Sequence, residues 1–352
     1  MGLLSHLFKY CLTKSLQVVW TSYTAALLLL GRIKYGSSFF AQIEHKKPEC
    51  LEGWNEGYLQ LDKVKLHYVQ TGSNDAPLLL FLHGYPEFWY SWRYQLKYFE
   101  RNYRCVAIDM RGYNLSDKPK NISDYNLDLL ANDVRQVVEK LGYKKAYLVS
   151  HDWGSIVAWR TALMFPDHIE KLVICQVPHP SAFRSAGLAQ LWKSWYMFMF
   201  QSPWIPELAV KAGDYLMLKQ MFWSQKAGLR NRENFTEEDL KAWKYVFSQP
   251  DTLTCAINYY RALFSAKAIT GQQAIVKPST LIIFGTGDKF VEVKGAENSI
   301  QYCRDGRLRR IEGASHWIMQ DEPELVNQYI EEFLTDNEPF DNKQSSTTGS
   351  KL

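Results

Sequence analysis

The sequence has no C-x-x-C pair and no closely spaced run of cysteines. Its six cysteines are scattered along the chain, which argues against a zinc finger or a small disulfide-bonded domain. Several fall inside predicted strands or helices, so we interpret them as buried free thiols. We expect neither a metal ion nor an organic cofactor. The cysteines are Cys11, Cys50, Cys105, Cys175, Cys255 and Cys303.

A large excess of charge of one sign is also missing. The formal net charge is +4, from 41 Lys and Arg against 37 Asp and Glu. No RNP motif or arginine-rich segment is present, so nucleic acid is not an expected partner. Internal repeats are absent, and 46% hydrophobic with 22% charged residues is a globular composition. The 352 residues suffice for one large core with an inserted subdomain.

One uncharged run stands near the N-terminus, SLQVVWTSYTAALLLLG at 15–31, with basic residues on both sides. A helix of that length rises about 25 Å, slightly less than the roughly 30 Å hydrocarbon core of a bilayer. We predict a single-pass membrane anchor, with a cleaved signal peptide and an amphipathic surface segment as the alternatives. The flanking charges leave its orientation open, as do the sequons at Asn114, Asn121 and Asn234.

Past residue 50, short apolar runs alternate with stretches of helical periodicity. This alternation predicts an α/β fold with a mostly parallel sheet that is covered by helices on both faces. Strands are expected over 64–72, 77–84, 103–112, 144–150, 170–178, 279–288 and 307–313, and helices over 127–142, 155–165 and 322–335.

The alternation stops after the fifth of these strands, at 170–178, and resumes about a hundred residues later. The intervening part is rich in aromatic residues and Met and has helical periodicity, so we predict a helical lid inserted into the α/β core. The predicted parts are an anchor region at 1–34, core at 50–179, lid at 180–269, core at 270–336 and a disordered tail at 337–352.

A cramped turn, SHDWGS at 150–155, joins a predicted strand to a predicted helix. Many hydrolases carry a nucleophilic serine at the centre of such an elbow, in the pattern G-x-S-x-G. Here the central residue is Asp152, while Ser150 and Ser155 stand to either side of it. A serine esterase would need one of these serines as its nucleophile, which makes that interpretation weak.

Candidate partners for Asp152 follow in the chain. Reactive groups gather beyond the carboxyl ends of parallel strands, and Asp288 stands at the end of the predicted strand at 279–288. Only His168, His179 and His316 come after Asp152, and only His316 lies in a loop after the last strand. We therefore predict Asp152, Asp288 and His316 as a triad, with Glu292 as a less favoured acid.

An aspartate at the elbow changes the chemistry. With a usual pKa of about 3.9 it is ionised at pH 7, so it can attack a saturated carbon without a base and form an alkyl ester. The histidine is then free to activate the water that hydrolyses the ester. We expect the backbone N–H groups of Tyr85 and Trp153 to hold the oxyanion that develops. Epoxides and alkyl halides are the matching substrates.

Three phrases carry a family resemblance: HGYPEFWYSW at 83–92, SHDWGS at 150–155 and ASHWIMQDEPELVNQYI at 314–330. Together they resemble the epoxide hydrolase branch of the α/β hydrolases over roughly residues 50–335, and DMRGY, VPHP, PWIPE, YVFSQP and INYYR look closest to animal epoxide hydrolases 3 and 4. The resemblance implies two lid tyrosines that protonate the epoxide oxygen, Tyr196 and Tyr260, with Tyr259 the residue most easily confused with the second. It also implies a cis bond between Tyr85 and Pro86.

The aromatic lid predicts an apolar pocket, in which we expect Phe88, Trp153 and Phe200 to contact the substrate. The expected substrates are lipophilic epoxides such as fatty-acid or isoprenoid epoxides, with water as the second reactant. The anchor would place the protein in a bilayer, by expectation that of the endoplasmic reticulum. Two alternatives remain: a haloalkane dehalogenase, which shares the aspartate elbow, and a membrane-tethered binding module without turnover.

Overall fold

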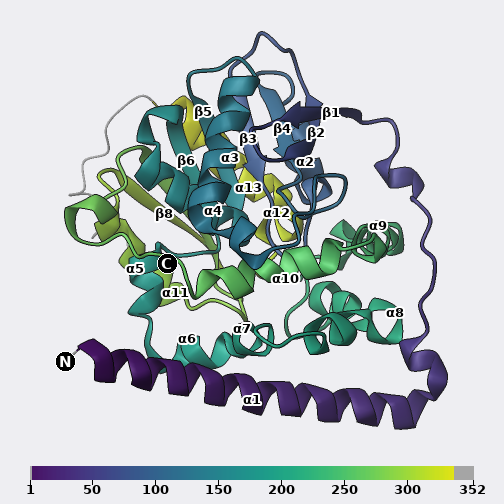
Figure 1. The fold of residues 1–352 in the computed structure, drawn as a ribbon. Helices are drawn as coiled ribbons and strands as arrows, with labels where there is room; N and C mark the ends of the chain where they lie inside the picture. The colour runs from purple at the N-terminus through teal and green to yellow at the C-terminus, as the bar shows by residue number, and fades with distance from the viewer. Residues whose placement is uncertain (1, 337–352) are drawn as a thin grey trace, which may run out of the picture.

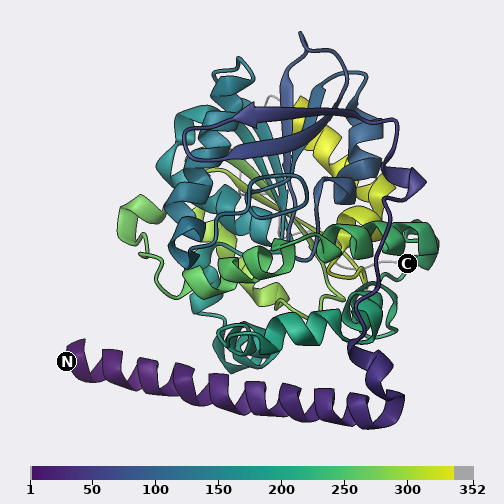
Figure 2. The same ribbon diagram turned by 45° about the vertical axis from the view of Figure 1, so that its right-hand side comes forward.

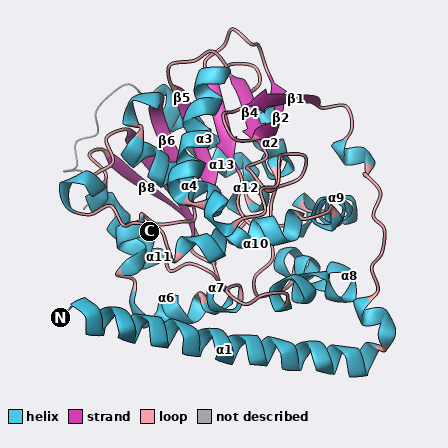
Figure 3. Cartoon of the chain, in the orientation of Figure 1, coloured by secondary structure: helices cyan, strands magenta, loops and turns pink. Residues whose placement is uncertain are grey.

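The computed structural model describes residues 2–336, and within them the centre of the molecule is an eight-stranded sheet (Figure 1, Figure 3). Its strands are β1 (Asn55–Gln60), β2 (Lys65–Thr71), β3 (Leu78–Leu82), β4 (Arg104–Ile108), β5 (Ala146–His151), β6 (Ile169–Cys175), β7 (Ser279–Gly285) and β8 (Gly306–Ile311). They lie in the order β1-β2-β4-β3-β5-β6-β7-β8. β2 is antiparallel to both of its neighbours, and the other pairs are parallel.

Helices cover both faces of the sheet, and Figure 2 shows the strands between two helical layers. On one side α3 packs beside α4, and on the other α2 packs beside α13. The strands of the centre are mostly apolar because both faces of the sheet are buried, and in β3 every residue is apolar and buried. The helices of the core are α2 (Arg93–Phe99), α3 (Leu127–Lys140), α4 (Trp153–Met164), α11 (Val293–Ser299), α12 (Ile318–Asp321) and α13 (Pro323–Thr335).

Local sequence signals explain where α3 begins and which side it buries. The side chain of Asn126 accepts a hydrogen bond from the backbone N–H of Asp128, at 2.9 Å, and so caps the first turn. Leu130, Val134 and Val137 recur at helical spacing and are buried against the core. The chain then turns at Gly142, whose φ of 91° is readily accessible to glycine.

A helical insertion lies between β6 and β7 and covers the carboxyl ends of the strands (Figure 1). Its helices are α5 (Pro180–Arg184), α6 (Gly187–Lys193), α7 (Trp195–Met199), α8 (Ile205–Trp223), α9 (Glu237–Ser248) and α10 (Thr252–Leu263). α8 is interrupted at residues 212–215, where Gly213, Asp214 and Tyr215 have positive φ. Below we call this insertion the lid.

The N-terminal helix α1 (Gly2–Tyr35) runs along the outer side of the lid in both ribbon views (Figure 1, Figure 2). It packs against α7 and α8. Gln17 and Thr21 hydrogen-bond to the hydroxyl of Ser202, at 3.2 and 2.5 Å, and the ring of Trp20 lies 5.3 Å from that of Trp195. By length and composition, its segment Tyr10–Tyr35 could cross a membrane.

The fold class and the predicted strands are confirmed, each within a few residues of its expected bounds. The sequence did not predict β1, an edge strand whose residues are polar and mostly exposed, or the short helices α2 and α11. The tail that the sequence predicts to be disordered, residues 337–352, lies outside the described residues.

Candidate active site

Asp152 lies at the sharp turn between β5 and α4, with φ 46° and ψ −117°. This conformation is unusual for a residue with a side chain, and close packing fixes it. At Gly154 a Cβ would stand 2.3 Å from the carbonyl oxygen of Leu82, and at Gly84 a Cβ would stand 2.4 Å from the Cβ of Asp152. The two glycines thus let the backbone fold tightly enough to present the carboxylate.

The two serines beside Asp152 are directed into the sheet. The hydroxyl of Ser150 donates to the carbonyl of Val173 at 3.0 Å, and that of Ser155 donates to the carbonyl of Cys175 at 3.1 Å. Both side chains are fully buried. They have structural partners, and the carboxylate of Asp152 occupies the centre of the elbow.

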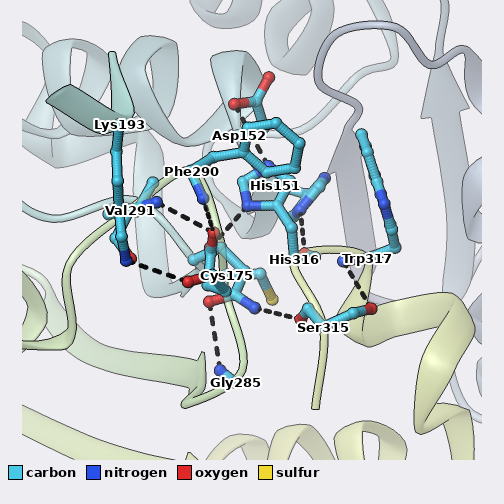
Figure 4. Close-up of polar contacts among 12 residues, drawn as sticks. His151, Asp152, Cys175, Lys193, Gly285, Phe290, Val291, Ser315, His316 and Trp317 are labelled. Atoms are coloured by element: carbon cyan, nitrogen blue, oxygen red, sulfur yellow. Dashed lines mark hydrogen bonds and ion pairs between the residues drawn. The ribbon is translucent and has the colours of Figure 1, made fainter. Parts of the chain in front are cut away.

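The imidazole of His316 lies between two carboxylates. Its Nδ1 is 2.6 Å from Oδ2 of Asp288, and its Nε2 is 3.5 Å from Oδ2 of Asp152. Asp288 is oriented in turn by the backbone N–H groups of Phe290 and Val291, which donate to its Oδ1 at 2.6 and 2.9 Å. Figure 4 shows the loop of Phe290 and Val291 beside the imidazole. The three predicted residues are therefore brought together.

The pKa values of Asp152 and His316 depend on each other. Burial by itself would raise the pKa of Asp152, but the hydrogen bond and charge of His316 outweigh it, and the pKa lies below its ordinary value. Burial would likewise lower the pKa of His316, whereas the carboxylates of Asp288 and Asp152 raise it to about 10. The free site therefore holds an aspartate anion against a protonated histidine.

A backbone donor points at the nucleophile position. The N–H of Tyr85 donates to Oδ1 of Asp152 at 2.8 Å, and the Tyr85–Pro86 bond is cis, as the resemblance implies. Trp153 is the first residue of α4, where helix N–H groups have no partner within the helix. An oxyanion formed on the side chain of Asp152 would lie close to both.

Two lid tyrosines face the same carboxylate. Tyr196 from α7 and Tyr260 from α10 line a cavity together with Asp152, and their ring centroids are 5.8 Å apart. Burial, and then the charge of Asp152, raises the pKa of both hydroxyls, so they stay protonated at neutral pH. Tyr259 points elsewhere, because its hydroxyl donates to the carbonyl of Arg111 at 2.8 Å.

The remaining predicted residues divide by position. Trp153 lines the large cavity at the site. Phe200 packs behind the tyrosines, 4.8 Å from the ring of Tyr260, and Phe88 lies in the core, 4.9 Å from the ring of Trp243. Neither phenylalanine belongs to the lining of the cavities at the site. Glu292, the less favoured acid, pairs with Lys193 at 3.0 Å, while Asp288 lies beside the histidine.

Two buried residues that sequence reasoning missed support the site from behind. His151 places Nδ1 2.7 Å from Oε2 of Glu87. Its Nε2 donates to the carbonyl of His316 at 2.8 Å, and Figure 4 shows these two histidines beside each other. Glu87 also accepts from the N–H of Gly84 at 2.8 Å. Their position in the sequence could have identified them, since His151 directly precedes Asp152 and Glu87 directly follows the Tyr85-Pro86 turn.

Two cavities meet at Asp152. The larger, of about 430 Å³, extends from Asp152, Tyr196 and Tyr260 along α4 and is mostly apolar. The smaller, of about 30 Å³, is lined by Asp152, His316 and the two tyrosines, among others, and it has room for a water molecule. Within residues 2–336, no group of three or more His, Cys, Asp or Glu side chains is placed to hold a metal ion.

A strand-to-helix elbow that carries a nucleophile, followed along the chain by an acid and a histidine after the last strand, defines an α/β hydrolase. In agreement, the sequence pattern of the α/β hydrolase fold matches residues 77–323. The relatives narrow this class. Epoxide hydrolase 2 of Caenorhabditis elegans is 48% identical over 340 residues, covering 96% of each chain, and human epoxide hydrolase 4 is 43% identical over 82% of each.

Solved structures agree with these relatives. The crystal structure of an epoxide hydrolase from Bacillus megaterium, in complex with an inhibitor, superposes with a TM-score of 0.72 at 29% identity, over 80% of this chain and 100% of that one. The chain belongs to the epoxide hydrolases. The similarity to epoxide hydrolases 3 and 4 is present, and the two C. elegans enzymes are more similar still, at 48 and 49%.

Proposed function

We propose that the protein converts lipophilic epoxides to vicinal diols through an ester on Asp152. The observation that carries this proposal is the position of that carboxylate, held by the N–H of Tyr85 and facing two tyrosine hydroxyls across an apolar cavity. A carboxylate oxygen attacks one ring carbon, and the bond from that carbon to the epoxide oxygen breaks. The released electron pair stays on the oxygen, which needs a proton.

Tyr196 and Tyr260 supply that proton. Their hydroxyls stay protonated beside Asp152 because its negative charge and the burial of the rings raise both pKa values. An alkoxide is a far stronger base than a phenolate, so transfer from one tyrosine is downhill while the other donates a hydrogen bond. A chloride or bromide leaving group needs no proton, which is why the paired tyrosines favour epoxides over alkyl halides.

The second half-reaction uses the change in charge at Asp152. Once esterified, Asp152 no longer carries the negative charge that helps to raise the pKa of His316. The pKa of His316 falls, and the imidazole gives its Nε2 proton to the tyrosinate left by the first half-reaction and can act as a base. It takes one proton from the attacking water and keeps it, and the other proton of that water leaves on the diol oxygen, so that Asp152 is again a carboxylate. A water molecule in the small cavity beside it attacks the ester carbonyl. The N–H groups of Tyr85 and Trp153 stabilise the oxyanion until the diol leaves.

A trapping experiment tests the ester. In His316→Gln an epoxide should alkylate the enzyme without release, so that the peptide containing residue 152 gains the mass of the substrate. In Asp152→Asn no adduct should form. Single turnover of the wild type in ¹⁸O water should place the label in Asp152, because the attacking water keeps its oxygen on the carboxylate and the product carries away the original one.

Each alternative predicts a different result. A dehalogenase would form the adduct from an alkyl halide and not from an epoxide. A binding module without turnover would give neither adduct nor diol from a panel of lipid epoxides. Label that appears in the diol and not in Asp152 would mean direct attack by water, and would overturn the proposal.

We also propose that α1 attaches the protein to a membrane. One side of α1 contacts the lid through Gln17, Trp20 and Thr21, whereas Leu29, Leu30 and Ile33 are exposed on its other side. A helix lying along the bilayer surface keeps these lid contacts, while the single crossing predicted from the sequence requires α1 to leave the lid. The crossing and the endoplasmic reticulum remain predictions.

Flotation with phospholipid vesicles tests the attachment. The full chain should float with the vesicles, and Leu29→Asp/Leu30→Asp should not, because the substitutions charge the outward side of α1. Ile122→Asp, at an exposed position outside α1, is the matched control and should float like the wild type. Unchanged flotation of the double variant would contradict attachment through this face.

A further inference from the structure

The large cavity has an uneven distribution of charge. Among the residues that line it, Asp152 is the only carboxylate, whereas three lining residues are basic: Arg160, Arg184 and Lys267. The rest of the lining is mostly apolar. The single negative group, Asp152, is at the proposed reaction centre, and the position of the three basic residues relative to it decides what they can bind.

Arg160 and Lys267 lie away from Asp152 in the cavity. Arg160 follows Asp152 by eight positions, which places it about 12 Å farther along α4 at 1.5 Å per residue. Its Nη1 donates to the carbonyl of Lys267 at 3.2 Å, so the chain at Lys267 lies beside that end of the helix. Lys267 and Arg184 both line the cavity and are exposed to solvent, so the cavity opens to solvent where these two residues line it. We call this opening the mouth.

The three cations differ in how far their charge is already balanced. Arg160 forms an ion pair with Asp128, and its Nε donates to Oδ1 of that residue at 2.6 Å. Arg184 donates to the hydroxyl of Ser181 at 3.1 Å, which is neutral. Among the side chains that the structure describes, no carboxylate forms an ion pair with Arg184 or Lys267. Two positive charges therefore remain at the mouth of an apolar cavity.

We propose that Arg184 and Lys267 form a subsite for the carboxylate of the substrate. The inference rests on the proposed function and narrows it, from lipophilic epoxides in general to epoxides of free long-chain acids. The carboxylate stays in solvent at the mouth, the methylene chain fills the apolar cavity, and the epoxide reaches Asp152 some distance along the chain. Neutral isoprenoid epoxides gain nothing from this subsite.

The subsite makes a modest contribution because it is exposed. A solvent-exposed ion pair contributes about 0.2–1 kcal/mol, or a factor of about 1.4 to 5 in affinity, and added salt weakens it. Loss of both charges should therefore raise KM for a free acid by about 2- to 25-fold. The reaction centre is untouched, so kcat should stay within about twofold.

The experiment compares a mid-chain epoxide of a long-chain fatty acid with its methyl ester. In Arg184→Gln/Lys267→Gln, KM for the acid should rise by the factor above, while KM for the ester stays the same. Lys226→Gln is the control, since this exposed lid lysine lies outside the lining of the cavity. In the wild type, sodium chloride should raise KM for the acid and leave that for the ester unchanged.

Several results would overturn the subsite. One is an equal change for acid and ester in the double variant, which would mean that the two residues only shape the cavity. Another is a wild-type enzyme without preference for the acid, or an acid KM in Lys267→Glu equal to that of the wild type. In each of these cases the proposed function stands. Failure of the wild type to hydrolyse either compound would overturn the proposed function and the subsite together.

Discussion

His151 donates from Nε2 to the carbonyl oxygen of His316, at 2.8 Å, from a fully buried position directly before the nucleophile. Its other ring nitrogen pairs with Glu87. His151, which directly precedes Asp152, thus holds in place the loop that carries His316, 28 positions past Asp288. This contact couples the elbow to the base.

Replacing His151 should slow ester hydrolysis more than ester formation. In His151→Gln the support for the His316 loop weakens, and only the second half-reaction uses His316 as a base. We expect the hydrolysis rate in single-turnover quench-flow to fall by about tenfold, with a smaller change in the alkylation rate. His168→Gln, at a surface histidine paired with Glu139, is the control and should leave both rates unchanged. Equal slowing of both steps would indicate a general loss of structure.

Gly84 should not tolerate a side chain. A Cβ at this position would stand 2.4 Å from Cβ and 2.7 Å from Oδ1 of Asp152, so Gly84→Ala must displace the nucleophile. A misplacement of about 1 Å costs on the order of 100-fold in rate, and we expect kcat/KM for diol formation to fall by about that factor. At Gly142 a Cβ meets open space, so Gly142→Ala should lower stability and keep activity. Full activity in Gly84→Ala would show that the elbow relaxes.

The titration of His316 should depend on Asp152. The pKa of His316 is raised to about 10 from an ordinary 6.5, so its protonated form stabilises the folded state fully below pH 6.5. This contribution is lost as the pH rises through about 10. In Asp152→Asn one of the two carboxylates is gone, the pKa falls, and the loss should begin at lower pH. NMR titration of the imidazole and unfolding free energies across pH 6 to 11 measure both effects.

Asp75→Asn, at an exposed carboxylate outside the site, is the control for that titration and should follow the wild type. An unchanged pKa of His316 in Asp152→Asn would mean that Asp288 alone sets it. The proposed fall in the pKa of His316 when Asp152 becomes an ester would then have no physical cause.

Loss of the hydroxyl of Tyr196 or Tyr260 should slow the reaction, whereas loss of the hydroxyl of the neighbouring Tyr259 should not. Tyr196→Phe and Tyr260→Phe each remove one donor to the epoxide oxygen, and we expect each to lower the alkylation rate by about 10- to 100-fold, with the double variant close to inactive. Tyr259→Phe is matched in size and neighbouring in sequence, but its hydroxyl donates to Arg111. It should lose about 1 kcal/mol of stability and keep its rate. A fast double variant would exclude the tyrosines as acids.

Much of the fold could be predicted from the sequence because the patterns that indicate its strands and helices are local. The apolar runs of β3 to β7 predict buried parallel strands, and helical periodicity predicts α3, α4 and α13. β1 was missed because an edge strand of polar residues has no apolar pattern and forms only by pairing with β2. Phe88 was expected in the substrate pocket, yet its ring packs on Trp243, a residue 155 positions later that the sequence does not bring near it.

By itself the sequence identified the proposed reacting groups, since an aspartate in a strand-to-helix elbow and a histidine after the last strand can be read from their order along the chain. Only the tertiary structure decided what surrounds them. Three features depend on contacts between residues far apart in sequence: the Glu87–His151 support, the packing of α1 on the lid and the basic mouth of the cavity. Such contacts follow from how elements pack in three dimensions, and no local pattern of residues encodes them.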